Sequence, residues 1–290
     1  MKFIKDSSNP IMTWHTEPAL VWINKTLYCY YRTDHSIGVM ESRDGLSWED
    51  HGVVLKPEIN DVFDSKQVIA PSVLYDNEHV YLYYEGYDGY GSEIGVAISD
   101  NPTGPFFKYG SVLQPSKFWE TSIVGTPLIT KSPSGKYYLF YHGASLGFMD
   151  RIGLAYGDGP LGPWKKEKCN PIYKGKFFAW DFIKTAPTSG IWNDSFDFTL
   201  FYEGFKGWPL TVHGFNIGGA EVLFNLDGTF FDIKPMINNP ILKRGSRGEW
   251  DDLTVQRPGV IKSPTGELWM YYSGADEYGF QLGRALEVIS

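Results

Sequence analysis

Three short sequence signals recur in the same order five times along the 290-residue chain. A proline followed by apolar residues comes first, an apolar run ending in a tyrosine pair or its near equivalent comes second, and an Ile-Gly or Leu-Gly step comes third. The prolines are Pro18, Pro71, Pro127, Pro187 and Pro258, the runs end at Tyr31, Tyr84, Tyr141, Tyr202 and Tyr272, and the glycines are Gly38, Gly95, Gly153, Gly218 and Gly283. Successive copies begin about 50–70 residues apart, so we expect one structural unit to be repeated five times.

Each copy has the character of a small antiparallel sheet. Its apolar runs are short, rich in aromatic and β-branched residues, and bounded by turn residues such as those at 76–77 and 133–135. No segment has the apolar period of an amphipathic helix. A copy of this length accommodates four strands, so the sequence predicts an all-β chain in which residues 1–290 form a single five-bladed β-propeller domain with four-stranded blades.

The two chain ends are expected to meet. The fifth copy stops soon after its third strand, near Arg284–Glu287, and therefore lacks an outer strand. Near the N-terminus, Phe3-Ile4-Lys5 followed by Asn9-Pro10-Ile11 resembles the ends of the third and fourth copies. We predict that residues near 2–5 form the outer strand of the last blade, which would cover an otherwise open sheet edge.

Composition limits the classes of partner. The formal net charge of -8 argues against binding to nucleic acid or to an anionic membrane, because no basic stripe is present to neutralise phosphates. The aromatic content of 17% suits both β-strands and stacking on sugar rings. The first residues lack an apolar run of signal-peptide length, so we expect a cytoplasmic protein, or a secreted one if a leader has been removed. Nothing in the sequence indicates an oligomeric state.

Polar residues are expected to converge on one face of the propeller. Strand one of each blade lines the axis and strand two runs back, so the residues before each proline, those after each tyrosine pair and the joining loops share that face. The candidate catalytic residues there are Glu17, Glu203, Asp181 and Glu85. The candidate substrate-binding residues are His15, Arg32, Asp64, Glu120, His142, Lys184, Trp208, Asp251 and Arg257.

Some of these acids also fit a structural role. Four of them follow an aromatic residue six or seven positions before a proline, and a carboxylate repeated at equivalent positions can serve loop hydrogen bonds or pair with a cation. These four are Asp64, Glu120, Asp181 and Asp251. Glu17 is different, because only the first copy has a carboxylate directly before its proline. Phe148, Trp208 and Tyr278 lie in glycine-rich segments, where they are candidates for either a stacking platform or simple packing.

The repeat resembles a known superfamily. The segments Tyr83-Tyr84-Glu85-Gly86, Ile94-Gly95-Val96-Ala97-Ile98-Ser99 and 37–45 are similar to motifs of the five-bladed glycoside hydrolases of families 43, 32, 68, 62, 117 and 130. The resemblance covers essentially the whole chain, and it is more specific for the fold than for an activity. It implies that the chain acts on a carbohydrate.

Carried over residue by residue, the resemblance is incomplete. Glu17 occupies the position of the base Asp of inverting family 43 enzymes, directly before the first proline. Thr126 stands where that family has an Asp that tunes the acid, and Thr185 stands where it has the acid itself. The segments 9–11, 30–32 and 83–86 look more like family 130 and its uncharacterised relatives.

A glycosidase needs an acid that protonates the leaving oxygen and a carboxylate on the opposite side of the sugar. The acid must have a raised pKa, which burial or a nearby like charge can supply. We expect Glu17 to be the base or nucleophile and Glu203 to be the acid, with Asp181 and Glu85 as the next candidates. Arg32 and Arg257 would bind sugar hydroxyls or a sugar carboxylate, and His142 would donate a hydrogen bond to the sugar.

Two alternatives remain open at the level of sequence. Loss of the family's acid and tuning residues is compatible with a carbohydrate-binding propeller that is catalytically impaired. Carboxylates and a histidine near a propeller axis can also hold Ca²⁺, although the chain has no compact motif with calcium-ligand spacing. We otherwise expect no cofactor.

Overall fold

The structure is a computed structural model that describes residues 1–59, 63–116, 118–145, 148–207 and 214–288. Apart from one short 3-10 helix, η1 (Phe118–Glu120), the regular elements of this part are β-strands, so the all-β prediction is confirmed. None of the described helices is long and apolar enough to span a membrane.

The strands pair into three sheets, and within each copy consecutive strands are antiparallel. The first copy forms a four-stranded sheet from β3 (Thr16–Ile23), β4 (Thr26–Arg32), β5 (Ile37–Ser42) and β6 (Glu49–Leu55). The fifth copy contributes β19 (Thr254–Lys262), β20 (Leu268–Asp276) and β21 (Gly279–Glu287) to a second sheet, which also contains β1 (Phe3–Lys5) and β2 (Met12–Thr13).

The three middle copies together form a twelve-stranded sheet. Its strands are β7 (Gln67–Asp76), β8 (His79–Tyr87), β9 (Ser92–Ser99), β10 (Phe107–Leu113), β11 (Ile123–Lys131), β12 (Tyr137–Ser145), β13 (Phe148–Gly157), β14 (Lys165–Lys166), β15 (Lys184–Trp192), β16 (Asp197–Phe205), β17 (Asn216–Phe224) and β18 (Phe230–Pro235). Single parallel residue pairs, Ile123 with Ser92 and Asp150 with Lys184, join the three antiparallel runs.

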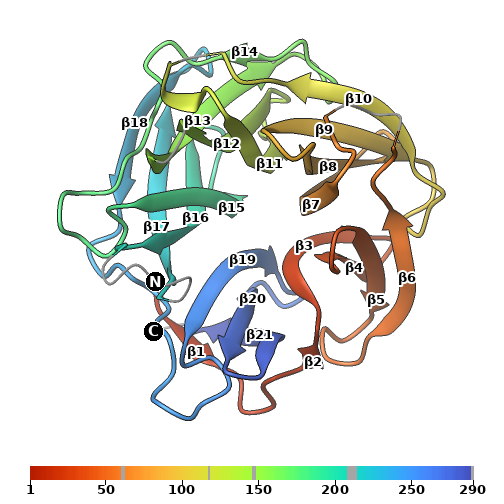
Figure 1. The fold of residues 1–290 in the computed structure, drawn as a ribbon, viewed down its shortest axis with the longest axis vertical. Helices are drawn as coiled ribbons and strands as arrows, with labels where there is room; N and C mark the ends of the chain where they lie inside the picture. The colour runs from red at the N-terminus through yellow and green to blue at the C-terminus, as the bar shows by residue number, and fades with distance from the viewer. Residues whose placement is uncertain (60–62, 117, 146–147, 208–213, 289–290) are drawn as a thin grey trace.

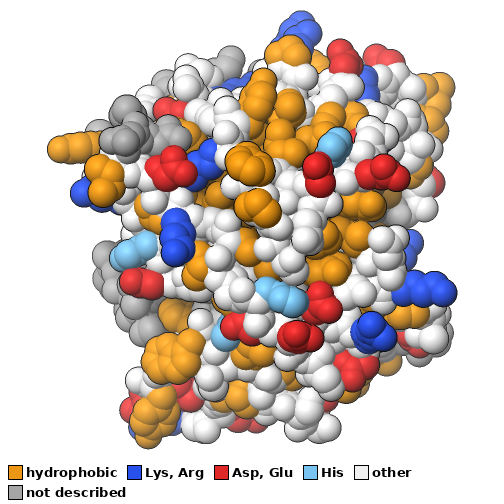
Figure 2. All heavy atoms as spheres, turned by 90° about the vertical axis from the view of Figure 1, so that its right-hand side faces the viewer, with side chains coloured by type: hydrophobic (Ala, Val, Ile, Leu, Met, Phe, Trp, Pro, Cys, Tyr) orange, Lys and Arg blue, Asp and Glu red, His pale blue; other side chains and the backbone are white. Residues whose placement is uncertain are grey.

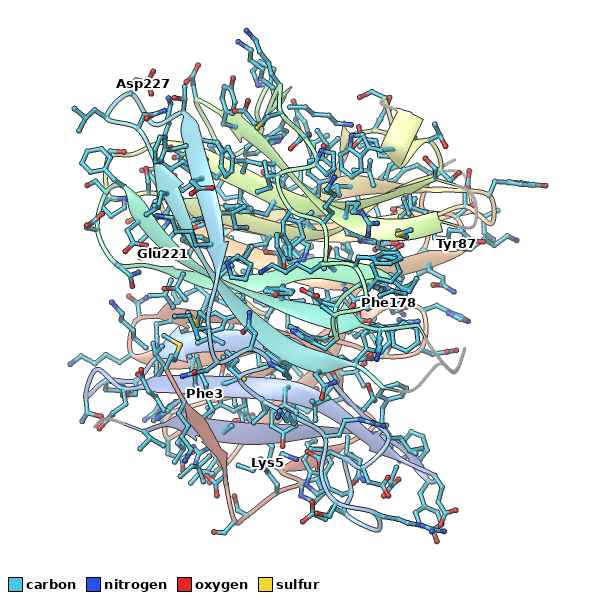
Figure 3. All side chains as sticks on the ribbon, turned by 90° about the vertical axis from the view of Figure 1, so that its left-hand side faces the viewer. Phe3, Lys5, Tyr87, Phe178, Glu221 and Asp227 are labelled. Atoms are coloured by element: carbon cyan, nitrogen blue, oxygen red, sulfur yellow. The ribbon has the colours of Figure 1, made fainter. Side chains whose placement is uncertain are left out.

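The copies are arranged around a central axis, with β3, β7, β11, β15 and β19 nearest to it (Figure 1). Each of these strands contacts the next, and β19 in turn contacts β3. Tyr87 at the end of β8 and Phe178 in a joining segment lie on one side of the molecule, whereas Glu221 and Asp227 lie on the other (Figure 3). Ends of second strands and joining segments therefore share a face, as expected from the strand directions.

The chain ends meet as predicted. β1 pairs with β21 in antiparallel register, Phe3 opposite Glu287 and Lys5 opposite Ala285, and Figure 3 shows Phe3 and Lys5 on this strand. The Phe3 ring is buried in the core, and the buried guanidinium of Arg284 pairs with Asp6. The N-terminal strand thus covers the outer edge of the fifth copy.

Tyrosine pairs hold neighbouring copies together. The hydroxyl of the first tyrosine of a pair donates a hydrogen bond to a backbone carbonyl in a turn between the third and fourth strands of another copy. Tyr30 donates to Pro102 (2.6 Å) and Tyr271 donates to Gly45 (2.7 Å). The rings themselves are buried, which confirms that these pairs belong to the core.

On the side of the molecule that carries β6 and β10, acidic and basic side chains are interspersed with apolar ones (Figure 2).

The Asn-Pro-Ile segments have a repeated structural task. Asn9 accepts a hydrogen bond from the backbone N–H of Arg284 (2.7 Å) and donates one to its carbonyl (2.8 Å). Asn170 and Asn239 bond in the same way to Leu154 and Gly219. Each asparagine therefore ties the segment that carries it to the third strand of a copy.

Candidate active site

The axial strands are irregular near their prolines. In four of them a register shift, the mark of a β-bulge, includes the residue before the proline, whereas in β15 the shift follows Pro187. Four of the residues that precede the prolines also have positive φ angles, namely Glu17 (55°), Ala70 (51°), Thr126 (42°) and Arg257 (52°). Bulges re-aim side chains, and left-handed backbone at non-glycine residues is costly and clusters at functional sites.

Glu17 is buried and held as an anion. Its Oε2 accepts a hydrogen bond from the backbone N–H of Ala70 (2.8 Å), and its Oε1 accepts one from Arg32 (3.1 Å). Burial alone would raise the pKa of Glu17, but Arg257, Arg32 and the Ala70 N–H outweigh it, so the pKa is lowered. An ionised carboxylate is the state required of a base or a nucleophile.

Arg257 links Glu17 to Glu203. Its Nε atom lies 3.6 Å from Glu17 Oε1 and 3.2 Å from Glu203 Oε2. These two oxygens are therefore no more than about 7 Å apart, an upper limit that excludes only the widest of the separations, about 5–9.5 Å, seen for the carboxylate pairs of glycosidases. Burial by itself would lower the pKa of Arg257, but Glu203 and Glu17 outweigh it, so the pKa is raised and the guanidinium stays charged.

Glu203 has a second cation. Lys184 Nζ lies 3.4 Å from Glu203 Oε1 and 3.4 Å from Asp150 Oδ2. Burial tends to lower the pKa of Lys184, and the carboxylates of Glu203 and Asp150 reverse this and raise it. Glu203 is only 1% exposed, so this carboxylate is enclosed by its ion pairs.

Glu85 and His142 complete the cluster. Glu85 Oε2 accepts a hydrogen bond from the Thr126 N–H (2.9 Å), and Arg257 donates to Thr126 Oγ1 (2.7 Å). Burial lowers the pKa of His142, against the opposing effect of Glu85 and Asp150, and so favours the neutral imidazole. Its Nδ1 has no hydrogen-bond partner among the described residues.

The four acids of the joining loops lie elsewhere. They are buried, and each accepts hydrogen bonds or an ion pair: Asp64 from Tyr84 (2.9 Å) and Lys108 (2.7 Å), Glu120 from Ser116 (3.2 Å) and Lys166, Asp181 from Tyr173 (2.7 Å) and Tyr202 (3.1 Å), and Asp251 from Tyr272 (3.0 Å) and Lys5 (2.7 Å). Asp181 thus bonds to two tyrosines instead of joining the Arg257 network. These contacts match the structural alternative considered for this set.

The remaining sequence candidates are placed as follows. The His15 ring packs on the Tyr31 ring at 4.2 Å between centroids, and its Nδ1 lies 2.6 Å from the Thr13 carbonyl oxygen. Trp208 lies outside the described residues, as does the side chain of Phe148. Tyr278 is exposed at the turn between β20 and β21. In the described part of the chain, no group of three or more His, Cys, Asp and Glu side chains is arranged to hold a metal ion.

A cavity of about 560 Å³ opens beside Glu17. Its lining includes Trp14, Arg32, Thr33 and Phe280. Sequence reasoning missed Trp14 and also Asp150, the second partner of Lys184. Trp14 had a detectable signal, because it lies three residues before the one carboxylate that directly precedes a proline. Asp150 had none, since it meets Lys184 only through a parallel pairing across two copies.

Comparison with known proteins bears on this arrangement. The sequence profile of "Glycosyl hydrolases family 43" matches residues 7–130, which include Glu17 and Glu85 and end before Glu203. A xylosidase/arabinosidase 43A of Humicola insolens is 42% identical over 80 residues, which make up 27% of this chain and 24% of that protein. The chain thus aligns with about a quarter of the length of this curated relative.

Solved structures of similar fold include a thermostable family-43 glycoside hydrolase (TM-score 0.76, 17% identity, 96% of this chain and 90% of that one). An endo-arabinase from Bacteroides thetaiotaomicron has a TM-score of 0.70 at 17% identity, covering 100% of this chain and 98% of that one. A family 130 structure, whose family is described as mannoside phosphorylases that include hydrolases of β-1,2 mannosidic linkages, has a TM-score of 0.73 at 16% identity and covers 98% and 93%.

These matches support the glycoside hydrolase propeller superfamily, without a specific family. Within this superfamily, the described cluster keeps a carboxylate at the base position and lacks one at Thr126 and at Thr185. Glu85 is hydrogen-bonded to the Thr126 backbone, and Glu203 stands opposite Ala186, next to Thr185, in the β15–β16 register. The Glu85 carboxylate on β8 therefore lies beside Thr126, and the Glu203 carboxylate on β16 lies beside Thr185.

Proposed function

We propose that this chain is a glycoside hydrolase built as a single five-bladed propeller, with its active site at the axis beside Glu17. The succession of contacts from β3 through β7, β11, β15 and β19 back to β3 supports the five blades. The observation that carries the function is the Glu17–Arg257–Glu203 arrangement, whose Glu17 lines an open cavity. It brings two carboxylates to within about 7 Å of each other, and glycoside cleavage uses such a pair.

Glu17 acts as the base or nucleophile in this proposal. Its lowered pKa keeps it ionised, and the Ala70 N–H and Arg32 fix its orientation. It is also among the residues that line the 560 Å³ cavity, so a sugar held there is within its reach.

Glu203 acts as the acid. It lies next to the position at which family 43 carries its acid, displaced to the neighbouring strand β16. In the free protein it is paired with Lys184 and Arg257. A bound sugar that draws these cations to its hydroxyl groups would free Glu203 to donate a proton to the leaving oxygen. Glu85, which accepts a hydrogen bond from the Thr126 N–H, would position this side of the site.

The relatives direct the choice of substrates. Their names point first to arabinose- and xylose-containing oligosaccharides, and then to β-1,2-linked mannosides. Purified protein should be screened on these oligosaccharides and on the matching aryl glycosides. We expect Glu17→Gln to lower kcat/KM by about 10²–10⁴-fold on every substrate that the wild type cleaves.

A comparison of leaving groups identifies the acid. Glu203→Gln should lose activity on natural oligosaccharides but retain most of it on aryl glycosides whose leaving group needs no protonation. Glu85→Gln should lower activity on both classes of substrate without this selectivity, and Glu58→Gln, at an exposed position, should behave as wild type. Full activity of both Glu17→Gln and Glu203→Gln would disprove the assignment.

A second function is favoured by one specific observation. Thr126 and Thr185 replace both of the family's other carboxylates, and Glu203 is ion-paired in the free protein. This combination suits a carbohydrate-binding propeller without catalysis. Glycan binding by wild-type protein, measured by calorimetry, without release of any product from the same glycan would favour this second function over the first.

A further inference from the structure

The first copy packs its second tyrosine differently from the others. In the other four copies, the aromatic residue that precedes the joining-loop acid packs over this tyrosine, with ring centroids 5.5–6.0 Å apart. These pairs are Phe63–Tyr84, Trp119–Tyr141, Trp180–Tyr202 and Trp250–Tyr272. In the first copy, His15 covers the Tyr31 ring and Asp50 accepts its hydroxyl hydrogen bond (2.6 Å). The neighbouring Trp14 is therefore not needed for this packing.

Residue 33 prevents the usual packing in the first copy. The other copies carry a glycine two positions after the second tyrosine, and an added Cβ would overlap the covering aromatic ring at Gly86, Gly143, Gly204 and Gly274. The first copy has Thr33 at this position. A threonine side chain would occupy the space that the aromatic ring uses elsewhere, and in the first copy His15 packs on the tyrosine while Trp14 is exposed.

Trp14 is held in its exposed position by the fifth copy. It is 73% exposed and has a φ of 63°, although the left-handed region is costly for a bulky residue. Its N–H donates to the Phe280 carbonyl (3.2 Å), and its ring lies so close to Gly279 that an added Cβ would come within 3.2 Å of the indole. A tryptophan that is exposed at the edge of a cavity and held on a strained backbone suits contact with a ligand better than packing in the core.

We propose that Trp14, with Phe280, forms a stacking subsite for a sugar ring next to the ring held at Glu17. Both aromatic residues line the cavity that contains Glu17 and Arg32. A pyranose or furanose ring has an apolar C–H face that packs on an indole, and the hydroxyls at its edge would meet Asp34 and Gln256 on the same cavity wall. The ligand is a neutral oligosaccharide of at least two residues that crosses from the first copy to the fifth.

This subsite rests on the proposed function, and its test separates the two. Glu17→Gln provides a background in which bound oligosaccharide is not consumed, and calorimetry with xylo- and arabino-oligosaccharides measures affinity there. Adding Trp14→Ala should weaken disaccharide and trisaccharide binding by about ten-fold, with little effect on the monosaccharide. Trp14→Phe should recover part of the affinity.

The controls address folding and specificity. Phe107→Ala removes another largely exposed aromatic residue, on β10, and should leave binding unchanged. Phe280→Ala provides an independent variant of the subsite and should weaken the same oligosaccharides. Affinity for oligosaccharides within two-fold of the parent in both Trp14→Ala and Phe280→Ala would overturn the subsite while leaving the glycosidase proposal intact. Failure of the wild type to bind or cleave any glycan in the panel would overturn both.

Discussion

The first and fourth copies share the same sequence repeat, but the loop that leads into the axial strand is packed differently in the two. In the fourth copy, Trp180 packs over Tyr202, and Asp181 accepts a hydrogen bond from the Tyr202 hydroxyl. The loop that carries Trp180 and Asp181 is therefore closed onto the sheet. In the first copy, the corresponding loop is open, with Trp14 exposed and a cavity beside Glu17. A repeat that is stable through contacts between its members can open one member for ligand binding, provided that the others remain closed.

The largest difference in stability between the fourth and first copies is expected when the acid that accepts the hydrogen bond of the tyrosine hydroxyl is removed. Asp181→Ala leaves the buried hydroxyls of Tyr173 and Tyr202 with only each other as partners in place of the carboxylate, and we expect a loss of about 2–4 kcal/mol in the free energy of unfolding. Asp50→Ala removes the acceptor of Tyr31, but this side chain is 43% exposed and water can replace it, so we expect a loss below about 1 kcal/mol. Urea unfolding of both variants measures the difference. Equal losses would mean that the first copy is as closed as the fourth.

A smaller difference is expected at the residue two positions after the second tyrosine. Gly204→Ala places a Cβ against the Trp180 ring and should cost about 1–3 kcal/mol. Thr33→Ala, at the equivalent place in the first copy, removes one partly exposed hydrogen bond to the Ser36 carbonyl (3.2 Å) and should cost no more than about 0.5–1 kcal/mol. Thermal and urea unfolding provide the measurement. A large loss in Thr33→Ala would contradict the idea that this residue only keeps the loop open.

The repeat made the fold predictable, because the same short signals must form the same strands in every copy. The pairing of residues 3–5 with β21 followed from the missing outer strand of the fifth copy. The carboxylates were harder to sort. Glu17 and Asp181 are both acids near a proline, and only the packing partners show that one faces a cavity and the other a tyrosine cluster.

Trp14 and Asp150 illustrate the limit of sequence reasoning more sharply. Trp14 belongs to the same aromatic class as Trp180, so composition cannot reveal that its ring is exposed. The decisive contacts of Trp14 are with Gly279 and Phe280 at the β20–β21 turn, more than two hundred residues away, while His15 packs on Tyr31. Such long-range contacts depend on how the copies pack together, and the local pattern of apolar and polar residues does not encode them.

The pH dependence of stability gives the finest comparison, because comparing Glu17→Gln with wild type isolates the acid that lines the cavity of the open copy. Glu17 has a pKa below its usual value of 4.5, so its protonated form is disfavoured in the folded chain. A carboxylate whose pKa is lowered by folding stabilises the native state above its unfolded-state pKa, and this contribution is lost as the pH falls through the folded value. A pKa lowered by one unit corresponds to about 1.4 kcal/mol. Urea unfolding between neutral pH and acid should therefore show a smaller loss of stability below pH 4.5 in Glu17→Gln than in wild type, while Glu58→Gln follows the wild type. Parallel curves for Glu17→Gln and wild type would mean that Arg257 and Arg32 do not hold Glu17 ionised, and the open copy would then contain no preformed base.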